Sequence, residues 1–268
     1  MLLKLTISVA FVCTFIFNIA RAQDKSLGKM VVEAGEFERS NSLVSVSLDG
    51  VEFDQANMNL KVLEVKGKNK ELVSSHIEQG YYAKLWWVLS GITTKKAKRT
   101  FELVLSPRDT IAEEKKVPMV SVEKDEDHIT VNVRDKNVLK YRISPIQAPE
   151  GVSGLYQRSG FIHPLSSPKG EVLTRIQPPD HYHHVGIWNP WTHTEFEERK
   201  VDFWNLNKAQ GTVRSKKVTL TESSDVMGRF KAIHEHVDLT APDASGSKVA
   251  LNEEWEVRVW NVDPESKV

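Results

Sequence analysis

The segment VALNEEWEVRVW at residues 249–260 decides the fold class. Its side chains alternate between two faces, with Val249, Leu251, Trp255, Val257 and Val259 on one face and Asn252, Glu254, Glu256 and Arg258 on the other. A period of two residues is typical of a half-buried β-strand, and a strand this long favours a broad sheet. The segment therefore predicts a sheet with one face against a core.

The same period recurs upstream in shorter pieces, beginning with Val44, Val46 and Leu48, which run into an Asp49-Gly50 turn. Similar segments lie at 60–66, 80–89, 99–105, 117–123, 128–134 and 137–143. No stretch keeps helical spacing over three turns, so we expect an all-β protein whose N-terminal part is a small β-sandwich.

The alternating pattern stops at residues 144–154, which hold two prolines and two glycines. We therefore expect an N-terminal sandwich-like domain over 23–147 and a larger His-rich β-sandwich domain over 148–268. Within the second domain, Thr194 and Glu197 fit a capping box, which predicts a loop with one short helical turn.

Residues 1–22 form an apolar run between Lys4 and the small residues Ala20 and Ala22, which is typical of a signal peptide cleaved before Gln23. The run is shorter than the roughly 20 residues of a membrane span, and no span follows it. We therefore expect a periplasmic or secreted protein. Cleavage removes the only cysteine, Cys13, so a metal would depend on His, Asp, Glu or backbone oxygen ligands.

Acidic and basic residues are balanced at 36 each, so nothing in the charge favours nucleic acid. The chemistry is concentrated in the histidines. Seven of the nine lie between residues 163 and 236, namely His163, His181, His183, His184, His193, His234 and His236. If 180–188 is extended, His181 and His183 share a face, as do His234 and His236 in their own strand. We expect these two pairs to converge on one pocket.

An imidazole can transfer protons near neutral pH, bind a metal or hydrogen-bond to sugar hydroxyls, and the sequence leaves all three open. The candidate catalytic residues are His163, Asp180, His183, His184 and His234. A divalent metal would bind His181, His183, His234 and His236. Substrate contacts would come from Trp188, Trp191, Trp204 and His193, although the tryptophans could equally be core residues.

Three motifs carry a family resemblance: FIHPL at 161–165, PPDHYHHVGIW at 178–188 and HTEFEERKVDFWNL at 193–206. In them the chain resembles the PmoA-like exported bacterial β-proteins, labelled "methane oxygenase PmoA" and otherwise of unknown function, over roughly residues 30–262. The resemblance implies a galactose-mutarotase-like sandwich and a carbohydrate substrate. It also implies that members continue beyond the strand ending near Trp260, so we expect the second domain to be incomplete.

The label itself implies a copper oxygenase, but the true methane monooxygenase subunit is a membrane protein with several spans, and we interpret the label as a misnomer. Our leading hypothesis is an exported carbohydrate-active enzyme with a His-rich pocket that takes a carbohydrate or another small molecule. Two alternatives stay open: a metal-dependent oxidoreductase, as the label implies, and a carbohydrate-binding module without turnover.

Overall fold

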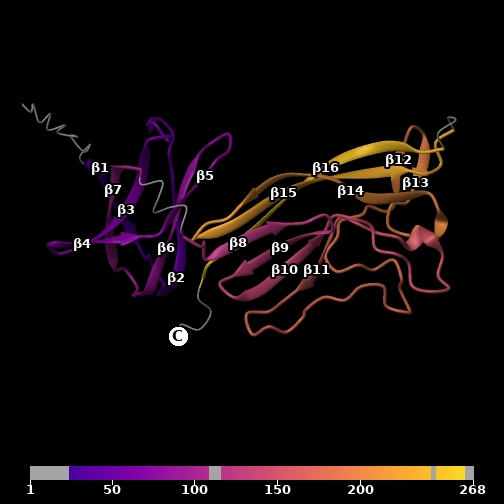
Figure 1. The fold of residues 1–268 in the computed structure, drawn as a ribbon, viewed down its shortest axis with the longest axis horizontal. Helices are drawn as coiled ribbons and strands as arrows, with labels where there is room; N and C mark the ends of the chain where they lie inside the picture. Colours follow the sequence, from indigo (N-terminus) through magenta and orange to yellow (C-terminus); the bar gives the residue numbers. More distant parts are fainter. Residues whose placement is uncertain (1–23, 109–115, 243–245, 263–268) are drawn as a thin grey trace, which may run out of the picture.

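The computed structural model describes residues 24–108, 116–242 and 246–262. Within these ranges the chain is nearly all β-structure, arranged as two sandwiches side by side (Figure 1). The expected signal peptide, its cleavage site and Cys13 lie outside the described residues. None of the helices in the described ranges reaches the length and apolar character needed to cross a bilayer.

The first sandwich packs a four-stranded antiparallel sheet against a three-stranded one. The larger sheet has the order β1 (Lys25–Glu33), β7 (Lys98–Pro107), β3 (Met58–Lys66), β4 (Asn69–Val73). The smaller has the order β2 (Arg39–Ser47), β6 (Lys84–Thr93), β5 (Ser75–Glu78). Alternate residues of the inner strands point into a shared core, where Trp87 of β6 packs 5.5 Å from Phe101 of β7.

The second sandwich has a four-stranded sheet facing three long strands. The first sheet has the order β11 (Phe161–Leu165), β10 (Lys136–Arg142), β9 (His128–Val133), β8 (Val120–Lys124). The second has the order β14 (Gly211–Glu222), β15 (Met227–Asp238), β16 (Lys248–Trp260). Buried side chains of both sheets, including Ile129, Tyr141 and Phe230, form its core. The prediction of a long strand at 249–260 and of an all-β fold is confirmed.

The domain division expected at residues 147 and 148 falls between β10 and β11, which are neighbours in one sheet. The hydrophobic clusters divide the chain earlier, between β7 and β8. Alternation identifies a strand but does not say which sheet the strand joins. The Pro/Gly-rich stretch at 144–154 is therefore a loop inside the second sandwich, and it ends in the short 3₁₀ helix η1 (Gly154–Tyr156).

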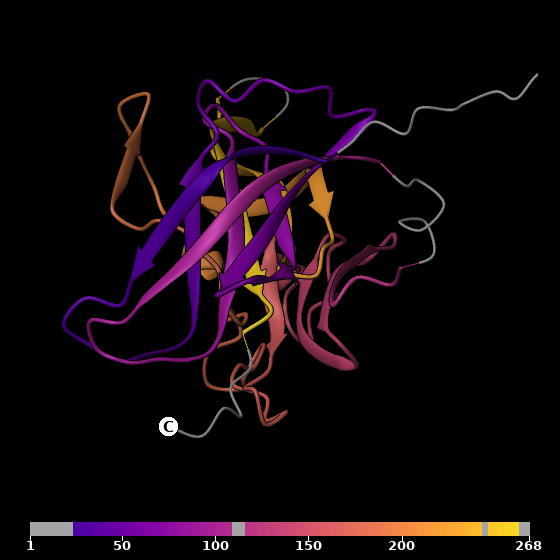
Figure 2. The ribbon, with the colours of Figure 1, turned by 90° about the vertical axis from the view of Figure 1, so that its left-hand side faces the viewer.

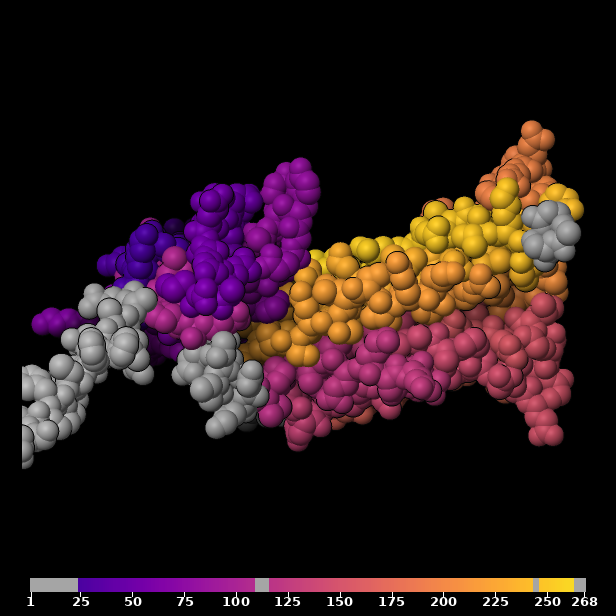
Figure 3. Space-filling view, turned by 45° about the horizontal axis from the view of Figure 1, so that its top comes forward, coloured from indigo at the N-terminus to yellow at the C-terminus, as the bar shows by residue number. Residues whose placement is uncertain are grey.

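A buried ionic network joins the two sandwiches. Figure 2 views the ribbon along the long axis of the molecule, with the first sandwich nearest the viewer. Glu78 at the end of β5 accepts hydrogen bonds from Arg229 of β15 and Arg258 of β16. Trp86 donates to the same carboxylate, and its ring lies 4.7 Å from that of Trp260. The segment between β5 and β6 rises beside β15 and β16 at this junction (Figure 3).

The prediction of a short helical turn after Thr194 is wrong. Residues 194–201 form a hairpin of β12 (Thr194–Phe196) and β13 (Arg199–Val201). Glu197 and Glu198 between the strands have φ of 49° and 62°. Two successive left-handed residues are the signature of a two-residue hairpin turn, and no capping box can form around them. The chain then continues into a second 3₁₀ helix, η2 (Leu206–Lys208).

Candidate functional site

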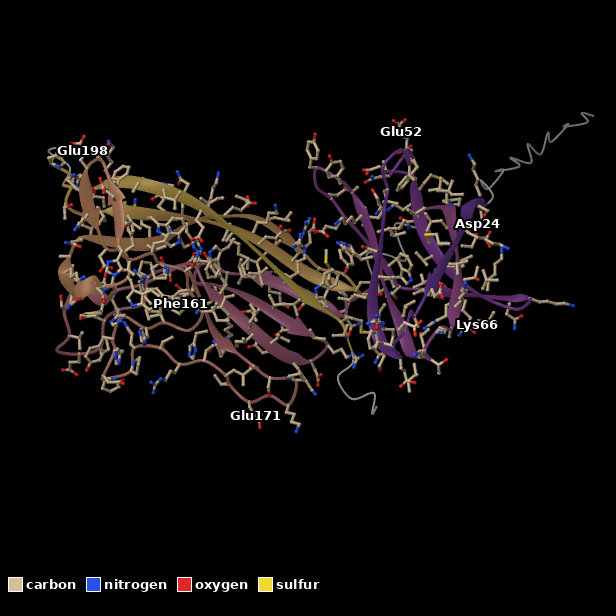
Figure 4. The ribbon with its side chains drawn as sticks, turned by 180° about the vertical axis from the view of Figure 1, so that it is seen from behind. Asp24, Glu52, Lys66, Phe161, Glu171 and Glu198 are labelled. Atoms are coloured by element: carbon tan, nitrogen blue, oxygen red, sulfur yellow. The ribbon has the colours of Figure 1, made fainter. Side chains whose placement is uncertain are left out.

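Three loops meet at the end of the second sandwich that lies farther from the first (Figure 1). They are the loop that carries η1, the segment 178–188 and the segment 202–208 that carries η2. Tyr156 of the first loop lies 5.9 Å from Tyr182 of the second, and His184 of the second lies 6.1 Å from Trp204 of the third, by ring centres. Figure 4 labels Phe161, at the start of β11, in this half of the molecule.

Three imidazoles and two indoles gather where these loops meet, and we refer to His181, His183, His184, Trp188 and Trp204 as the histidine–tryptophan cluster. The ring of His184 lies 4.9 Å from His181 in a stacked arrangement and 4.4 Å from His183 in an edge contact. The rings of Trp188 and Trp204 are 4.9 Å apart. His183 and both indoles are half-buried, so the cluster reaches the surface.

The prediction that residues 180–188 are extended is wrong for the first half of this segment, which forms turns. The amide of His181 donates to the carbonyl of Pro178, and the amide of His184 donates to that of His181. These turns place residues three apart beside each other, which is why His181 stacks on His184 instead of sharing a strand face with His183. All three imidazoles consequently meet, where the spacing predicted only two.

Gly186 holds this loop against β11. Ile187 pairs with Ile162, and a Cβ built on Gly186 would lie 2.1 Å from the carbonyl oxygen of Ile162. Gly186 also has a φ of 53°, so both its space and its backbone favour glycine. His163 on β11 borders the loop and hydrogen-bonds to Thr174 at 2.9 Å through Nδ1.

Asp202 positions Trp204, and both of its carboxylate oxygens accept hydrogen bonds. Its buried carboxylate accepts hydrogen bonds from the amides of Trp204 and Asn205, the side chain of Asn205 and the ammonium of Lys208. Burial alone would raise the pKa of Asp202, but these donors hold it well below its ordinary value. Asp202 is therefore a positioning residue.

The cluster keeps His183 neutral. Burial lowers its pKa below 6.5, and the neighbouring charges of His184, His181 and Arg158 lower it further. Burial also lowers the pKa of His163. Asp180 is exposed and contacts His181 at 3.1 Å, so it orients His181 and does not contact His183 or His184. A neutral imidazole can accept a proton or a hydroxyl hydrogen bond.

The second histidine pair lies elsewhere, inside the sandwich. His234 and His236 of β15 are completely buried. Tyr141 Oη lies 2.8 Å from Nε2 of His234, and Glu253 Oε2 lies 3.6 Å from Nδ1 of His234 and 3.2 Å from Nε2 of His236. The expectation that both pairs open into one pocket is therefore wrong, because the inward face of β15 lies between the two sheets. Asn189, next to Trp188, donates to Glu253 and links the two groups.

The remaining two candidates lie outside the cluster. Trp191 is half-exposed and packs 6.0 Å from His236. His193 is exposed just before β12, and within the described ranges it makes no ring contact with the cluster.

The family follows from a comparison with known proteins. A family model described as "Family of unknown function (DUF6807)" matches residues 128–267, which span β9 to β16 and contain the histidine–tryptophan cluster. The chain belongs to this family. Neither the curated proteins nor the solved structures contain a match. The resemblance to a family of unknown function is thus confirmed, whereas the PmoA-like label is not.

The metal-ligand set predicted from the spacing does not come together in this DUF6807 chain. His181 and His183 are in the loop cluster, while His234 and His236 bind Glu253 between the sheets. Across residues 24–108, 116–242 and 246–262, no group of three or more His, Cys, Asp or Glu side chains is arranged to hold a metal ion.

Sequence reasoning missed two residues of this DUF6807 chain that matter here. Glu253 falls on the inward face of β16, between the apolar Leu251 and Trp255, and that interruption of the alternation was the available signal. Arg158 is 2% exposed and lies with its guanidinium carbon 4.4 Å from the ring centre of Trp188. Nothing in the spacing around Arg158 distinguishes it from a surface arginine.

Proposed function

We propose that this chain is an exported carbohydrate-active protein that binds a sugar at the histidine–tryptophan cluster and acts on it through a neutral imidazole. The observation that carries the proposal is the half-buried pair of Trp188 and Trp204, 4.9 Å apart, with the ring of His184 within 6.5 Å of both. Flat indole faces pack well on the C–H faces of sugar rings, and convergent polar groups then fix orientation.

The imidazoles supply those polar groups. His183 and His184 have ring nitrogens that can exchange hydrogen bonds with hydroxyl groups beside the indoles. Because burial and neighbouring charge lower the pKa of His183, it is neutral near pH 7 and suited to accept a proton from a sugar hydroxyl or a water. His184 stacks on His181 and contacts both indoles at an angle, and Asp180 contacts the outer ring, His181. His163 borders the same loop.

Export and the carbohydrate substrate class rest on the sequence. The apolar leader at 1–22 supports a periplasmic or exterior location, and the resemblance of the three motifs to the PmoA-like proteins supports a sugar as the substrate. Direct binding measurements test the substrate class.

The test is binding and turnover by the purified chain from residue 23 on a broad panel of glycans. We expect at least one glycan to bind, with affinity falling about 10-fold or more in Trp188→Ala or Trp204→Ala, as expected for the loss of a buried aromatic contact. Trp191→Ala is the matched control, because Trp191 is half-exposed but outside the cluster. Equal affinities in all three variants, or no glycan binding at all, would overturn the proposal.

His183→Ala separates an enzyme from a binding module. For an enzyme, this variant retains glycan binding and loses turnover by about 100-fold or more, the usual contribution of general acid–base catalysis. If the wild-type chain binds a glycan without converting any member of the panel, the site is a binding module and the catalytic part of the proposal fails.

A further inference from the structure

Arg158 is a buried cation that has no anionic partner among the residues that the structure describes. Its side chain is 2% exposed, and its Nη1 donates a single hydrogen bond to Thr212 Oγ1 at 3.2 Å. Nη2 is buried and has no hydrogen-bond partner among the described residues, and no carboxylate within those residues forms an ion pair with Arg158. Burial lowers the pKa of Arg158 to about 9, so it still carries its charge at neutral pH.

Arg229, the second deeply buried arginine within the described ranges, gives the contrast. Arg229 is 3% exposed, and its guanidinium hydrogen-bonds to the carboxylates of Glu222, Glu78 and Glu256. Burial of a charge is strongly unfavourable unless it is paired, so Arg229 follows the usual rule and Arg158 departs from it. The unpaired Arg158 lies next to the histidine–tryptophan cluster.

Among the described residues, the carboxylates near Arg158 already have other partners. Its guanidinium carbon lies over the face of Trp188, and its charge contributes to the lowered pKa of His183. The oxygens of Asp202 are already taken by the donors around η2, and Asp180 is engaged by His181. The cluster and the adjoining Arg158 together therefore offer one permanent cation, three imidazoles and two indole rings, and no unengaged carboxylate lies beside them among the described residues.

We propose that the sugar bound at the histidine–tryptophan cluster carries a carboxylate, as a uronic acid does, and that Arg158 is the counter-charge for it. This inference rests on the proposed function. A flat guanidinium beneath an indole matches a planar carboxylate better than a single ammonium would. Because Trp188 covers the guanidinium and is only half-buried, its indole moves aside when the carboxylate reaches Nη2, and the sugar ring then packs on Trp188 and Trp204.

The test titrates glucuronate, glucose and acetate into the purified chain from residue 23, followed by calorimetry and tryptophan fluorescence. We expect glucuronate to bind at least about 10-fold more tightly than glucose, since a hydrogen bond to a charged group contributes about that much. Arg158→Gln removes this difference between glucuronate and glucose. Arg214→Gln is the matched control, because Arg214 pairs with Glu235 on the outer face of β14. The fluorescence change on glucuronate disappears in Trp188→Phe.

The outcomes separate this inference from the proposed function. Equal binding of glucose and glucuronate, unaffected by Arg158→Gln, overturns the carboxylate inference and leaves the carbohydrate function standing. Equal Arg158-dependent binding of acetate and glucuronate, with none of glucose, supports an anion site and overturns the sugar function. No fluorescence or calorimetric response to either anion overturns the inference.

Folding of the variants is checked by thermal unfolding without ligand. If Arg158 serves a ligand, Arg158→Met removes an unpaired buried charge and its Tm is not lower than that of the wild-type chain. A clearly lower Tm for Arg158→Met, with no gain in wild-type Tm on adding glucuronate, assigns Arg158 a structural role and overturns the inference.

Discussion

Glu78 at the end of β5 and Arg229 on β15 form a buried ion pair with 3.0 Å between Oε1 and Nη1, across the junction of the two sandwiches. Arg258 donates to the same oxygen, and Arg229 also reaches the carbonyl of Gln79. A large, open hollow of about 710 Å³ adjoins this network, lined by aromatic side chains such as Tyr81, Trp86 and Trp260. The two sandwiches are therefore joined by a specific polar contact.

Glu78→Ala tests this junction. Removing one partner of a buried pair leaves the other charge uncompensated, so we expect the free energy of unfolding to fall by about 3 kcal/mol in urea titrations. The exposed pair of Glu71 with Lys66, 2.7 Å apart, supplies the control, and Glu71→Ala should cost less than about 1 kcal/mol. A similar small loss in both variants would mean that the junction does not stabilise the chain.

Gly186→Ala tests how the loop 178–188 is held. The new Cβ would lie 2.1 Å from the carbonyl oxygen of Ile162, in a left-handed conformation with φ of 53°. We expect a loss of about 3–5 kcal/mol from the combined overlap and strain. Gly170→Ala separates the two terms, because Gly170 has a φ of 90° with nothing within 4 Å of a built Cβ and should lose only about 1–2 kcal/mol. Equal losses would show that only backbone strain matters.

The long strands of this protein could be predicted from the sequence because they pack one face against a core, as the alternating residues Trp255, Val257 and Val259 do. Sheet membership could not be predicted, since alternation does not name a partner strand. The division of the chain between β7 and β8 depends on which strands pair. The loop at 144–154 is rich in Pro and Gly, so its sequence alone resembles that of a linker between domains.

The candidate site could be predicted in part. The three motifs located His181, His183, His184, Trp188 and Trp204, which do meet. Their geometry could not be read from a strand period, because Pro178 and His181 carbonyls close turns there. Because His234 and His236 share one face of their strand, the sequence predicts that they open into the same pocket as His181 and His183. That face is the inward one, and the only signal for Glu253, which pairs with His234 on the next strand, was the carboxylate that interrupts an apolar face of β16.

The protonation of His183 gives a prediction in pH. Burial and the charges of His184 and His181 lower its pKa, so NMR titration of its ring should give a midpoint below 6.5. Because the folded pKa is below the unfolded one, His183 destabilises the fold only as the pH falls below about 6.5. Replacing both His181 and His184 by Gln removes two of the lowering charges and should raise the midpoint toward 6.5. A midpoint at or above 6.5 in the wild-type chain would contradict the assignment of His183 as a neutral base.

Glu253 gives the corresponding prediction for acid stability. Burial alone would raise its pKa, but hydrogen bonds from His236 and Asn189, together with the nearby rings of His234 and Trp255, outweigh burial and hold the pKa below the ordinary value. A carboxyl group with a lowered folded pKa stabilises the fold above its unfolded pKa of about 4.3, and this stabilisation is lost as the pH falls below that value. Glu253→Gln should therefore be less stable than the wild-type chain at pH 7, with the difference shrinking as the pH approaches 3 in urea titrations. Glu254→Gln is the control, because Glu254 lies on the outer face of β16, where it pairs with Lys231. A constant difference between Glu253→Gln and wild type at all pH values would mean that packing, and not the carboxylate charge, holds His234 and His236 in place.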